Sequence, residues 1–110
     1  MTPLEIQIDG TPDAPVLVLR GEIDLSSVVG LRTAVEELPR DDTDQVIIDL
    51  ADVTFMDSTG LGWMAGLARG GCAVQLRRTP NAIRKLLEVT GIDGVVSFLP
   101  DPDPDADLEA

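Results

Sequence analysis

The sequence predicts an α/β fold built around a mixed five-stranded sheet. Short apolar runs rich in β-branched residues alternate along the chain with segments whose apolar residues recur at helical spacing, and turn-forming residues separate them. These observations give the element order β-β-α-β-α-β-α-β. Because strands separated by a helix must run parallel, only the opening hairpin is expected to be antiparallel.

The chain is expected to open with a β-hairpin. Apolar and polar residues alternate over residues 4–8, which is typical of a half-buried strand, and Val-Leu-Val-Leu at residues 16–19 indicates a better buried one. Gly-Thr-Pro-Asp at residues 10–13 has the composition of a turn. The two strands should therefore pair directly with each other.

Three helices are predicted after the hairpin. Asp24 or Ser26 is placed to cap the first helix, and Pro39 marks its end. The second helix directly follows the third strand. Thr-Pro at residues 79–80 opens the third helix, and Gly91 stops it. The positions expected on the inner faces are Val28, Leu31, Val35 and Leu38, then Leu61, Met64, Ala65 and Ala68, then Ile83, Leu86, Leu87 and Thr90.

Three further strands are expected to pair in parallel. Val-Ile-Ile-Asp-Leu at residues 46–50 is typical of a strand buried on both faces, and residues 73–76 and 95–99 supply two more apolar runs. In such sheets functional groups gather beyond the carboxyl ends of the parallel strands. Asp24 and the pair at residues 57–58 should therefore meet at one edge of the sheet.

The composition indicates one soluble globular domain, residues 1–100, followed by an acidic tail, residues 101–110. The chain has 110 residues, 44% of them hydrophobic, and no apolar run approaches the ~20 residues of a membrane span. Alternating Asp and Pro in the tail oppose a packed helix or strand. The start lacks signal-peptide features and Cys72 has no second cysteine to pair with, so a cytoplasmic location is expected.

The residue types that the chain lacks argue against most enzymatic and metal-dependent functions. With no histidine and one cysteine, it has no Ser-His-Asp triad and no His or Cys metal site. It contains neither a GxxxxGK[ST] loop nor GxGxxG after a strand. Asp41, Asp42 and Asp44 are expected in a solvated loop. No catalytic residue, metal or cofactor is therefore expected.

The charge of the chain narrows the choice of partners. A formal net charge of −12 opposes binding to nucleic acid and to anionic membrane surfaces. Half of the eight basic residues fall within nine positions, at Arg77, Arg78, Arg84 and Lys85, and are interpreted as a solvated face. Protein or small-molecule partners remain.

Residues 52–62, DVTFMDSTGLG, place two hydroxyls, Ser58 and Thr59, where a strand passes into a helix. Asp57, Ser58 or Thr59 can cap that helix, whose first N–H groups lack partners within the helix and whose end carries partial positive charge. A phosphate group would be well accommodated there. The segment therefore suggests a phosphorylation switch.

The same segment also fits ordinary helix capping, and the glycines favour the switch. Asp-Ser-Thr before an apolar run is typical of many helix starts. Gly60, Gly62 and Gly66, however, each cost the helix ~1 kcal/mol relative to alanine. Glycine lets another backbone approach closely, which indicates a contact surface.

Three segments resemble one known family. They are GEIDLSS at residues 21–27, VIIDLADVTFMDSTGLG at residues 46–62 and PNAIRKLLEVTGID at residues 80–93. Together they resemble the STAS domain, specifically the stand-alone anti-sigma factor antagonist, over residues 4–99. The resemblance implies a STAS-like fold and partner switching: the unphosphorylated form binds an anti-sigma factor with serine kinase activity and frees the sigma factor, and phosphorylation ends that binding. A serine phosphatase is the second implied partner.

The resemblance also implies roles for individual residues. Ser58, directly after the motif aspartate, matches the phosphoacceptor of the family. Its matched neighbours are two acids, a second hydroxyl and two glycines: Asp24, Asp57, Thr59, Gly60 and Gly62. A phosphate adds about −1.5 to −2 charge, which the helix start tolerates but which a close interface beside two acids does not. Affinity should therefore change while the fold survives.

Two other function classes stay open. The chain is shorter between Gly62 and Gly71 than the family usually is, and it lacks the final helix of many relatives. The shortened second helix suggests a STAS scaffold subunit of a phospholipid transporter or stress-signalling complex, which binds without a phosphate cycle. The α/β topology and the glycines at the carboxyl edge leave an enzyme or nucleotide-binding domain as the third class.

Overall fold

The computed structural model describes residues 3–38 and 45–100, and its elements follow the predicted order. The expectations for Pro39, for the acids at 41, 42 and 44, and for the tail lie outside the described residues. The elements are β1 Glu5–Thr11, β2 Ala14–Ile23, α1 Val28–Glu36, β3 Gln45–Met56, α2 Ser58–Arg69, β4 Ala73–Arg77, α3 Asn81–Thr90, the 3₁₀ helix η1 Ile92–Gly94 and β5 Ser97–Phe98.

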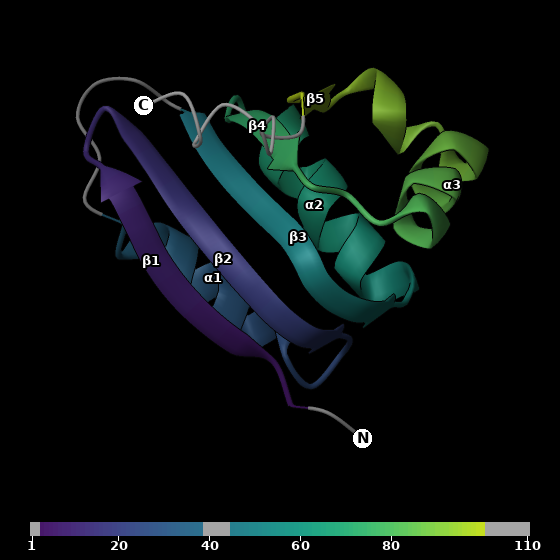
Figure 1. Ribbon diagram of the computed structural model, residues 1–110, viewed down its shortest axis with the longest axis horizontal. Helices are drawn as coiled ribbons and strands as arrows, with labels where there is room; N and C mark the ends of the chain where they lie inside the picture. Colours follow the sequence, from purple (N-terminus) through teal and green to yellow (C-terminus); the bar gives the residue numbers. More distant parts are fainter. Residues whose placement is uncertain (1–2, 39–44, 101–110) are drawn as a thin grey trace, which may run out of the picture.

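The strands form one mixed sheet in the order β1-β2-β3-β4-β5. β1 and β2 pair antiparallel as a hairpin, whereas β2–β3, β3–β4 and β4–β5 are parallel. This arrangement confirms the predicted α/β class and the predicted direction of every strand. Helices α1 and α2 lie together behind the sheet, and α3 lies beside α2 at the β4–β5 side (Figure 1).

A single core fills the space between the sheet and the helices. Alternate residues of the three central strands point into it, and each of the three helices contributes apolar side chains from its predicted inner face. Members that are fully buried are Leu17, Leu19, Ile23, Leu31, Val46, Ile48, Leu50, Met64, Leu76 and Leu87. The predicted inner positions Leu86 and Thr90 of α3 lie outside this core, because both are exposed.

β3 differs from the expectation of a strand with two apolar buried faces. Ile48 and its alternate neighbours are buried against the helices, but Ile47 on the other face is only partly buried. Asp49 on that same face is 1% exposed, so a charged side chain, rather than an apolar one, is buried on this face. The reason is local pairing with two arginines, described below.

The carboxyl edge of the sheet is stepped. β3 pairs with β4 only as far as Asp49 opposite Arg77, but it continues beside β2 until Met56 opposite Ile23. Two irregularities in the β2–β3 register accompany this extension. The far end of β3, where α2 begins, is therefore flanked by β2 alone.

The third helix begins and ends as predicted, whereas the last strand is shorter than predicted. Pro80 is the N-cap of α3, and Gly91 ends it with φ of 78°, a left-handed conformation that glycine adopts without steric cost. Ile92 then buries its side chain in η1, which the sequence interpretation missed. The strand predicted over residues 95–99 accordingly shrinks to Ser97–Phe98.

Candidate functional site

The start of α2 is capped by Asp57. Its backbone is extended, and its Oδ1 accepts a hydrogen bond of 3.0 Å from the N–H of Gly60. Ser58 is the first residue of the helix and is exposed, while Thr59 is partly buried. Of the three predicted capping candidates, Asp57 is therefore the cap, and the hydroxyl of Ser58 is left at the surface.

Asp24 lies in the loop that joins β2 to α1. Its Oδ1 accepts hydrogen bonds from the Ser26 hydroxyl at 2.6 Å and from the N–H groups of Ser26 at 3.0 Å and Ser27 at 3.2 Å. The Ser26 hydroxyl is the largest of the causes that lower the pKa of the Asp24 carboxyl. Asp24 is therefore a fixed negative charge at this edge.

The predicted capping of α1 by Asp24 or Ser26 is wrong in detail. Ser27 occupies the N-cap position, and its side chain caps no N–H of the helix. Asp24 instead organises the turn before the helix, where its carbonyl accepts from the N–H groups of Ser27 and Val28, each at 3.1 Å. A short acidic side chain with serines two and three residues later favours such a local turn over direct capping.

The two loops meet because β2 and β3 end side by side. Ile23 and Met56 are register partners, so Asp24 and Asp57 directly follow paired residues. The N–H of Asp57 also donates a 3.1 Å hydrogen bond to the carbonyl of Ile23. The structure thus confirms the expectation that Asp24 and residues 57–58 share one carboxyl edge.

Gly60 permits this close meeting, whereas Gly62 and Gly66 have no such internal role. A Cβ at position 60 would lie 2.7 Å from Cγ2 of Ile23 and 2.9 Å from Cγ of Met56. A Cβ at position 62 or 66 would meet nothing within 4 Å. Both of these glycines are exposed. The face of α2 that carries Gly62 and Gly66 is therefore directed away from the core.

Large apolar side chains lie exposed on the segments that bound this site. Leu25 follows Asp24 and is 74% exposed, Val29 one turn later is 68% exposed, and Phe55 near the end of β3 is 49% exposed. These side chains are available for apolar contacts with a protein partner. The sequence interpretation did not find them, since exposure depends on tertiary packing.

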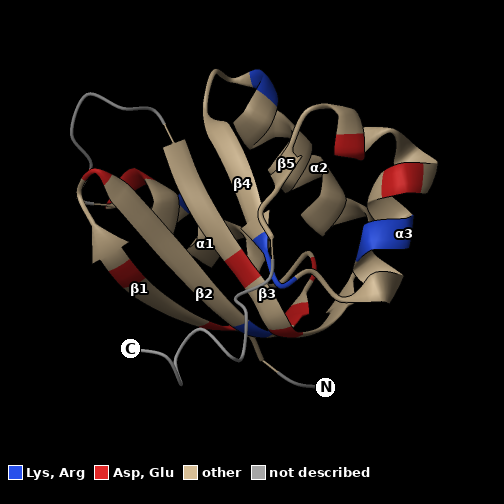
Figure 2. Cartoon of the chain, turned by 45° about the horizontal axis from the view of Figure 1, so that its top comes forward, with Lys and Arg blue, Asp and Glu red and all other residues tan. Residues whose placement is uncertain are grey.

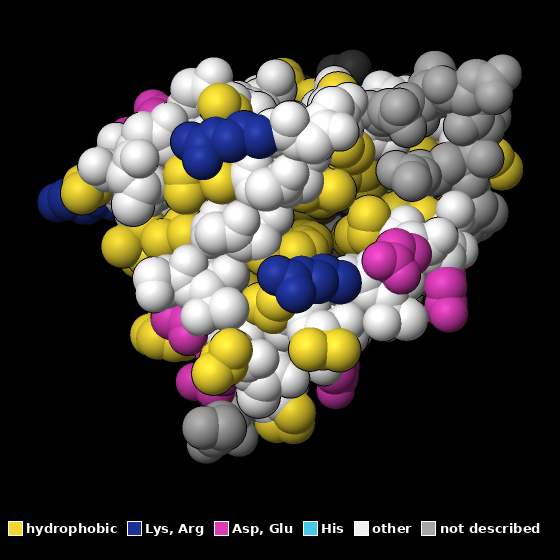
Figure 3. Space-filling view, turned by 180° about the vertical axis from the view of Figure 1, so that it is seen from behind, with side chains coloured by type: hydrophobic (Ala, Val, Ile, Leu, Met, Phe, Trp, Pro, Cys, Tyr) yellow, Lys and Arg dark blue, Asp and Glu magenta, His cyan; other side chains and the backbone are white. Residues whose placement is uncertain are grey.

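A shallow hollow lies between α1 and α2. It has a volume of about 270 Å³ and is lined by Arg32, Val35, Glu36, Gly62, Trp63, Gly66 and Leu67. On this helix-bearing side of the molecule, apolar side chains reach the surface over a broad central area (Figure 3). The hollow begins one turn after Ser58, because Gly62 lies four residues along the same face of α2.

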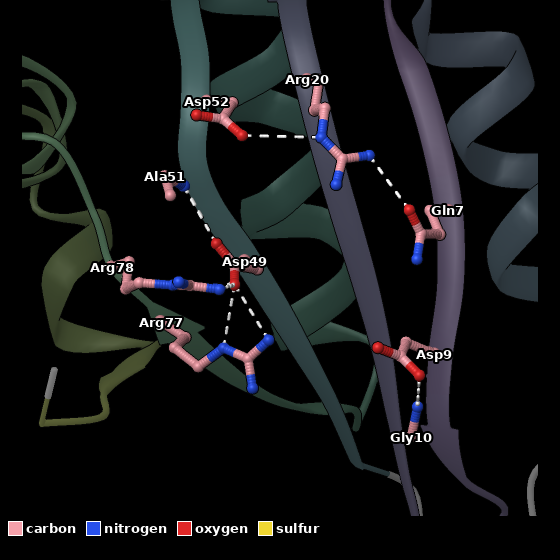
Figure 4. Close-up of polar contacts among 9 residues, drawn as sticks. All are labelled: Gln7, Asp9, Gly10, Arg20, Asp49, Ala51, Asp52, Arg77 and Arg78. Carbon is pink, nitrogen blue, oxygen red and sulfur yellow. Dashed lines mark hydrogen bonds and ion pairs between the residues drawn. The ribbon is translucent and has the colours of Figure 1, made fainter. Parts of the chain in front are cut away.

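A second charged cluster lies on the opposite side of the sheet from α1 and α2. Oδ2 of Asp49 accepts from Nε of Arg77 at 3.0 Å and of Arg78 at 3.1 Å, and its Oδ1 accepts from the N–H of Ala51 at 3.0 Å (Figure 4). The basic end of β4 lies beside an acidic position of β3 (Figure 2). Arg77 is partly exposed and Arg78 is exposed, as the interpretation of a solvated face expects, but both guanidinium groups also pair with the buried Asp49, which that interpretation did not include.

Arg84 has different surroundings from Arg77 and Arg78. Arg84 stacks over the ring of Phe98, with its guanidinium carbon 4.1 Å from the ring centre, and lies 4.0 Å from the Glu88 carboxylate. Arg77 and Arg78 pair with Asp49 instead. The pairing was not predicted because Asp49 and Arg78 are 29 positions apart, and only strand register brings them together.

Within residues 3–38 and 45–100, no group of Cys, Asp and Glu side chains is arranged to hold a metal ion. No helix in these ranges has both the length and the apolar character needed to cross a membrane.

Comparison with known families and curated proteins gives consistent matches. The family model described as "Mlab, STAS domain" matches residues 6–100. The anti-sigma-B factor antagonist of Bacillus subtilis (strain 168) is 32% identical over 84 residues, covering 73% of this chain and 76% of the relative. The protein of the same name from Staphylococcus aureus (strain NCTC 8325) is 30% identical over 76 residues, covering 66% and 70%.

Solved structures share the fold at lower identity. An anti-sigma factor antagonist from Mycobacterium paratuberculosis superposes with a TM-score of 0.75 at 22% identity, covering 97% of this chain and 92% of that one. The unphosphorylated anti-sigma factor antagonist SpoIIAA gives a TM-score of 0.67 at 22% identity, with coverage of 96% and 94%. These similarities establish the mixed sheet with its three helices as the fold of that group.

Proposed function

The chain belongs to the STAS domain family, and from this we propose that it is an anti-sigma factor antagonist that acts by partner switching. Two curated relatives at 30% identity or more carry the antagonist name. That name describes a regulator, and the chain is accordingly a regulatory protein and not an enzyme. Its proposed place of action is the cytoplasm, where it would meet an anti-sigma factor.

The observation that carries the proposal is the exposed hydroxyl of Ser58 at the first position of α2. A kinase active site requires a hydroxyl that it can reach, and Ser58 satisfies this condition whereas the half-buried Thr59 satisfies it less well. The unpaired N–H groups and partial positive charge of the helix start accommodate the added phosphate. Phosphorylation at Ser58 is therefore compatible with the folded domain.

The proposed binding surface surrounds that hydroxyl. Exposed Leu25, Val29 and Phe55 supply apolar contacts, and Asp24 and Asp57 supply charge. In the unphosphorylated form these groups would meet an anti-sigma factor with serine kinase activity, so that the sigma factor is released. A serine phosphatase would restore the binding form.

The phosphate acts on affinity through charge. A phosphoserine adds about −1.5 to −2 charge next to Asp57, whose carboxylate is already committed to the helix cap. At a close interface, the added charge brings repulsion and a desolvation cost, and ~3 kcal/mol is enough to weaken binding more than a hundredfold. The fold itself has no need to change.

The test of the site is phosphorylation in vitro. The full chain is incubated with an anti-sigma factor of the serine kinase class and ATP, and phosphate incorporation is measured by mass spectrometry. One phosphate is expected, which Ser58→Ala removes. Ser97→Ala is the matched control, because Ser97 is also exposed but lies on β5. Modification that persists in Ser58→Ala would refute the site.

The test of the mechanism compares two variants of the same position. Calorimetry should show that Ser58→Asp binds the anti-sigma factor at least tenfold more weakly than wild type. The neutral Ser58→Asn should lose much less binding affinity. Equal losses in both variants would show that side-chain shape, rather than charge, controls binding.

A scaffold subunit of a transporter or stress-signalling complex is the second candidate. The matching family model is described as "Mlab", which differs from the antagonist name of the curated relatives. This difference is the reason to retain the scaffold function as a candidate. This reading expects binding that is insensitive to Ser58→Asp, together with co-purification of an ATPase. Purification of the complex from native lysate with the wild-type and Ser58→Asp chains separates the two functions.

A further inference from the structure

We propose that Ser26 is a positioning residue of the switch site, because it holds the Asp24 carboxylate in a fixed place at the edge that the partner meets. This inference rests on the proposed function, and it adds a residue that the family resemblance does not assign. Ser26 is exposed and lies two residues beyond Asp24 in the β2–α1 loop. Its role is therefore separable from the folding of the core.

Ser26 donates two hydrogen bonds to the carboxylate of Asp24. Its hydroxyl donates to Oδ1 of Asp24 at 2.6 Å, and its N–H donates to the same oxygen at 3.0 Å. A hydroxyl bonded to an ionised carboxylate forms a short and comparatively strong hydrogen bond. The hydroxyl is also the largest cause of the lowered pKa of Asp24, as expected for a donor that binds the ionised form of the carboxylate.

The neighbouring Ser27 has a different role. Its hydroxyl accepts a 2.9 Å hydrogen bond from the N–H of Asp24 and lies 3.1 Å from the Asp24 carbonyl and 3.3 Å from the Glu22 carbonyl. The Ser27 hydroxyl thus bonds the backbone and closes the loop. The Ser26 hydroxyl makes the shortest of the three bonds to Oδ1 of Asp24, and the N–H groups of Ser26 and Ser27 make the other two. Loss of the Ser26 hydroxyl should therefore hold the carboxylate less firmly while the loop keeps its backbone bonds.

The fixed carboxylate is close to the switch because the loop is anchored there. Asp24 directly follows Ile23, whose carbonyl accepts the N–H of Asp57 at 3.1 Å. A charge already held in place loses less conformational entropy when a partner binds than one that must first be ordered. Ser26 should therefore increase the affinity of the unphosphorylated form through Asp24.

The experiment is a double-mutant cycle of Ser26→Ala and Asp24→Asn in the full chain. Binding to an anti-sigma factor of the serine kinase class is measured by calorimetry, and the Asp24 carboxyl is titrated by NMR. Ser26→Ala should weaken binding roughly threefold to tenfold. It should also move the pKa of Asp24 up toward its ordinary value. In the Asp24→Asn background, Ser26→Ala should have no further effect on affinity.

Two variants serve as controls. Ser26→Thr keeps a hydroxyl and should restore most of the affinity, whereas Ser97→Ala removes an exposed hydroxyl on β5 and should leave affinity unchanged. Equal weakening by Ser26→Ala with and without Asp24 would overturn the inference, as would wild-type affinity in Ser26→Ala. Wild-type protein that fails to bind the anti-sigma factor would contradict the proposed function as well as the inference. If the wild type binds and Ser26→Ala binds with the same affinity, only the inference about Ser26 is contradicted.

Discussion

The carbonyl oxygen of Ile23 accepts a hydrogen bond of 3.1 Å from the N–H of Asp57. This bond joins the last residue of β2 to the residue that caps α2, beyond the register pair of Ile23 and Met56. The loop that carries Asp24 and the helix start that carries Ser58 are therefore held by the same short piece of backbone. A change at this junction should affect both parts of the proposed binding surface.

The junction predicts opposite effects for two glycines of the same helix. Gly60→Ala should lower the free energy of unfolding by about 1–2 kcal/mol, because the new Cβ would lie 2.7 Å from Cγ2 of Ile23. Gly62→Ala should raise it by up to about 1 kcal/mol, because that Cβ meets open space and alanine favours the helix. Urea unfolding followed by the fluorescence of Trp63, the single tryptophan, measures both. A stabilising Gly60→Ala would contradict the close contact.

A negative charge at Ser58 should stabilise the fold even though it weakens partner binding. Ser58 is the first residue of α2, and acidic groups in the first turn contribute about 0.3–1 kcal/mol through the helix dipole. Thermal unfolding should therefore show Ser58→Asp at or above the wild-type midpoint, with the neutral Ser58→Asn below Ser58→Asp. A clear loss of stability in Ser58→Asp would mean that the phosphate acts by disrupting the domain.

The Asp49 cluster predicts a specific loss of stability in acid. Burial alone would raise the pKa of Asp49, but hydrogen bonds from Arg78, the Ala51 N–H and Arg77 outweigh it, so the pKa is lowered from its ordinary value of 3.8. A lowered folded-state pKa stabilises the protein fully above that ordinary value. The contribution is lost as pH falls through the folded-state pKa.

Asp49→Asn tests this dependence. The variant should be less stable than wild type at pH 7 by about 2–3 kcal/mol, a smaller loss than for a fully buried pair because both guanidinium groups reach solvent. As pH falls below about 4 the difference should shrink, and the two proteins should converge once pH is below the folded-state pKa of Asp49. Urea unfolding at a series of pH values gives both curves, and parallel curves throughout would exclude Asp49 as the responsible group.

The backbone of Arg78 predicts a difference between two substitutions that remove the same side chain. Arg78 has φ of 53°, in the left-handed region that costs residues other than glycine about 1–2 kcal/mol. Arg78→Ala and Arg78→Gly both lose the bonds to Asp49. Chemical unfolding should nevertheless show Arg78→Gly to be more stable than Arg78→Ala by about 1 kcal/mol. The opposite order would show that the backbone relaxes once the pairing is lost.

Local sequence signals predicted the fold well where an element has its own boundary markers. Pro80 and Gly91 fixed the ends of α3, and the hairpin turn followed from Gly-Thr-Pro-Asp at residues 10–13. The short 3₁₀ helix at residues 92–94 was missed, because a single turn has too few residues to show a periodic pattern. The last strand was therefore predicted to be longer than it is.

Some features of the candidate site could likewise be predicted from the sequence, and others could not. The position of Ser58 at a helix start and the shared edge with Asp24 could be predicted from spacing and the rule for parallel sheets. The exposure of Leu25 and Phe55 could not be predicted, because both are apolar, Phe55 lies within β3 and Leu25 lies just beyond the end of β2. Whether such a residue is covered depends on which helices pack over it.

The sequence by itself determined the element order, the direction of each strand and the hydroxyl at the start of α2, because periodicity, capping and parallel crossover connections are local properties. Only the tertiary structure decided that Asp57 is the cap, that Gly60 rather than Gly62 or Gly66 is needed for close packing of α2 and that Asp49 is buried against two arginines. These outcomes depend on strand register and on contacts between segments far apart in the chain, which no local pattern specifies.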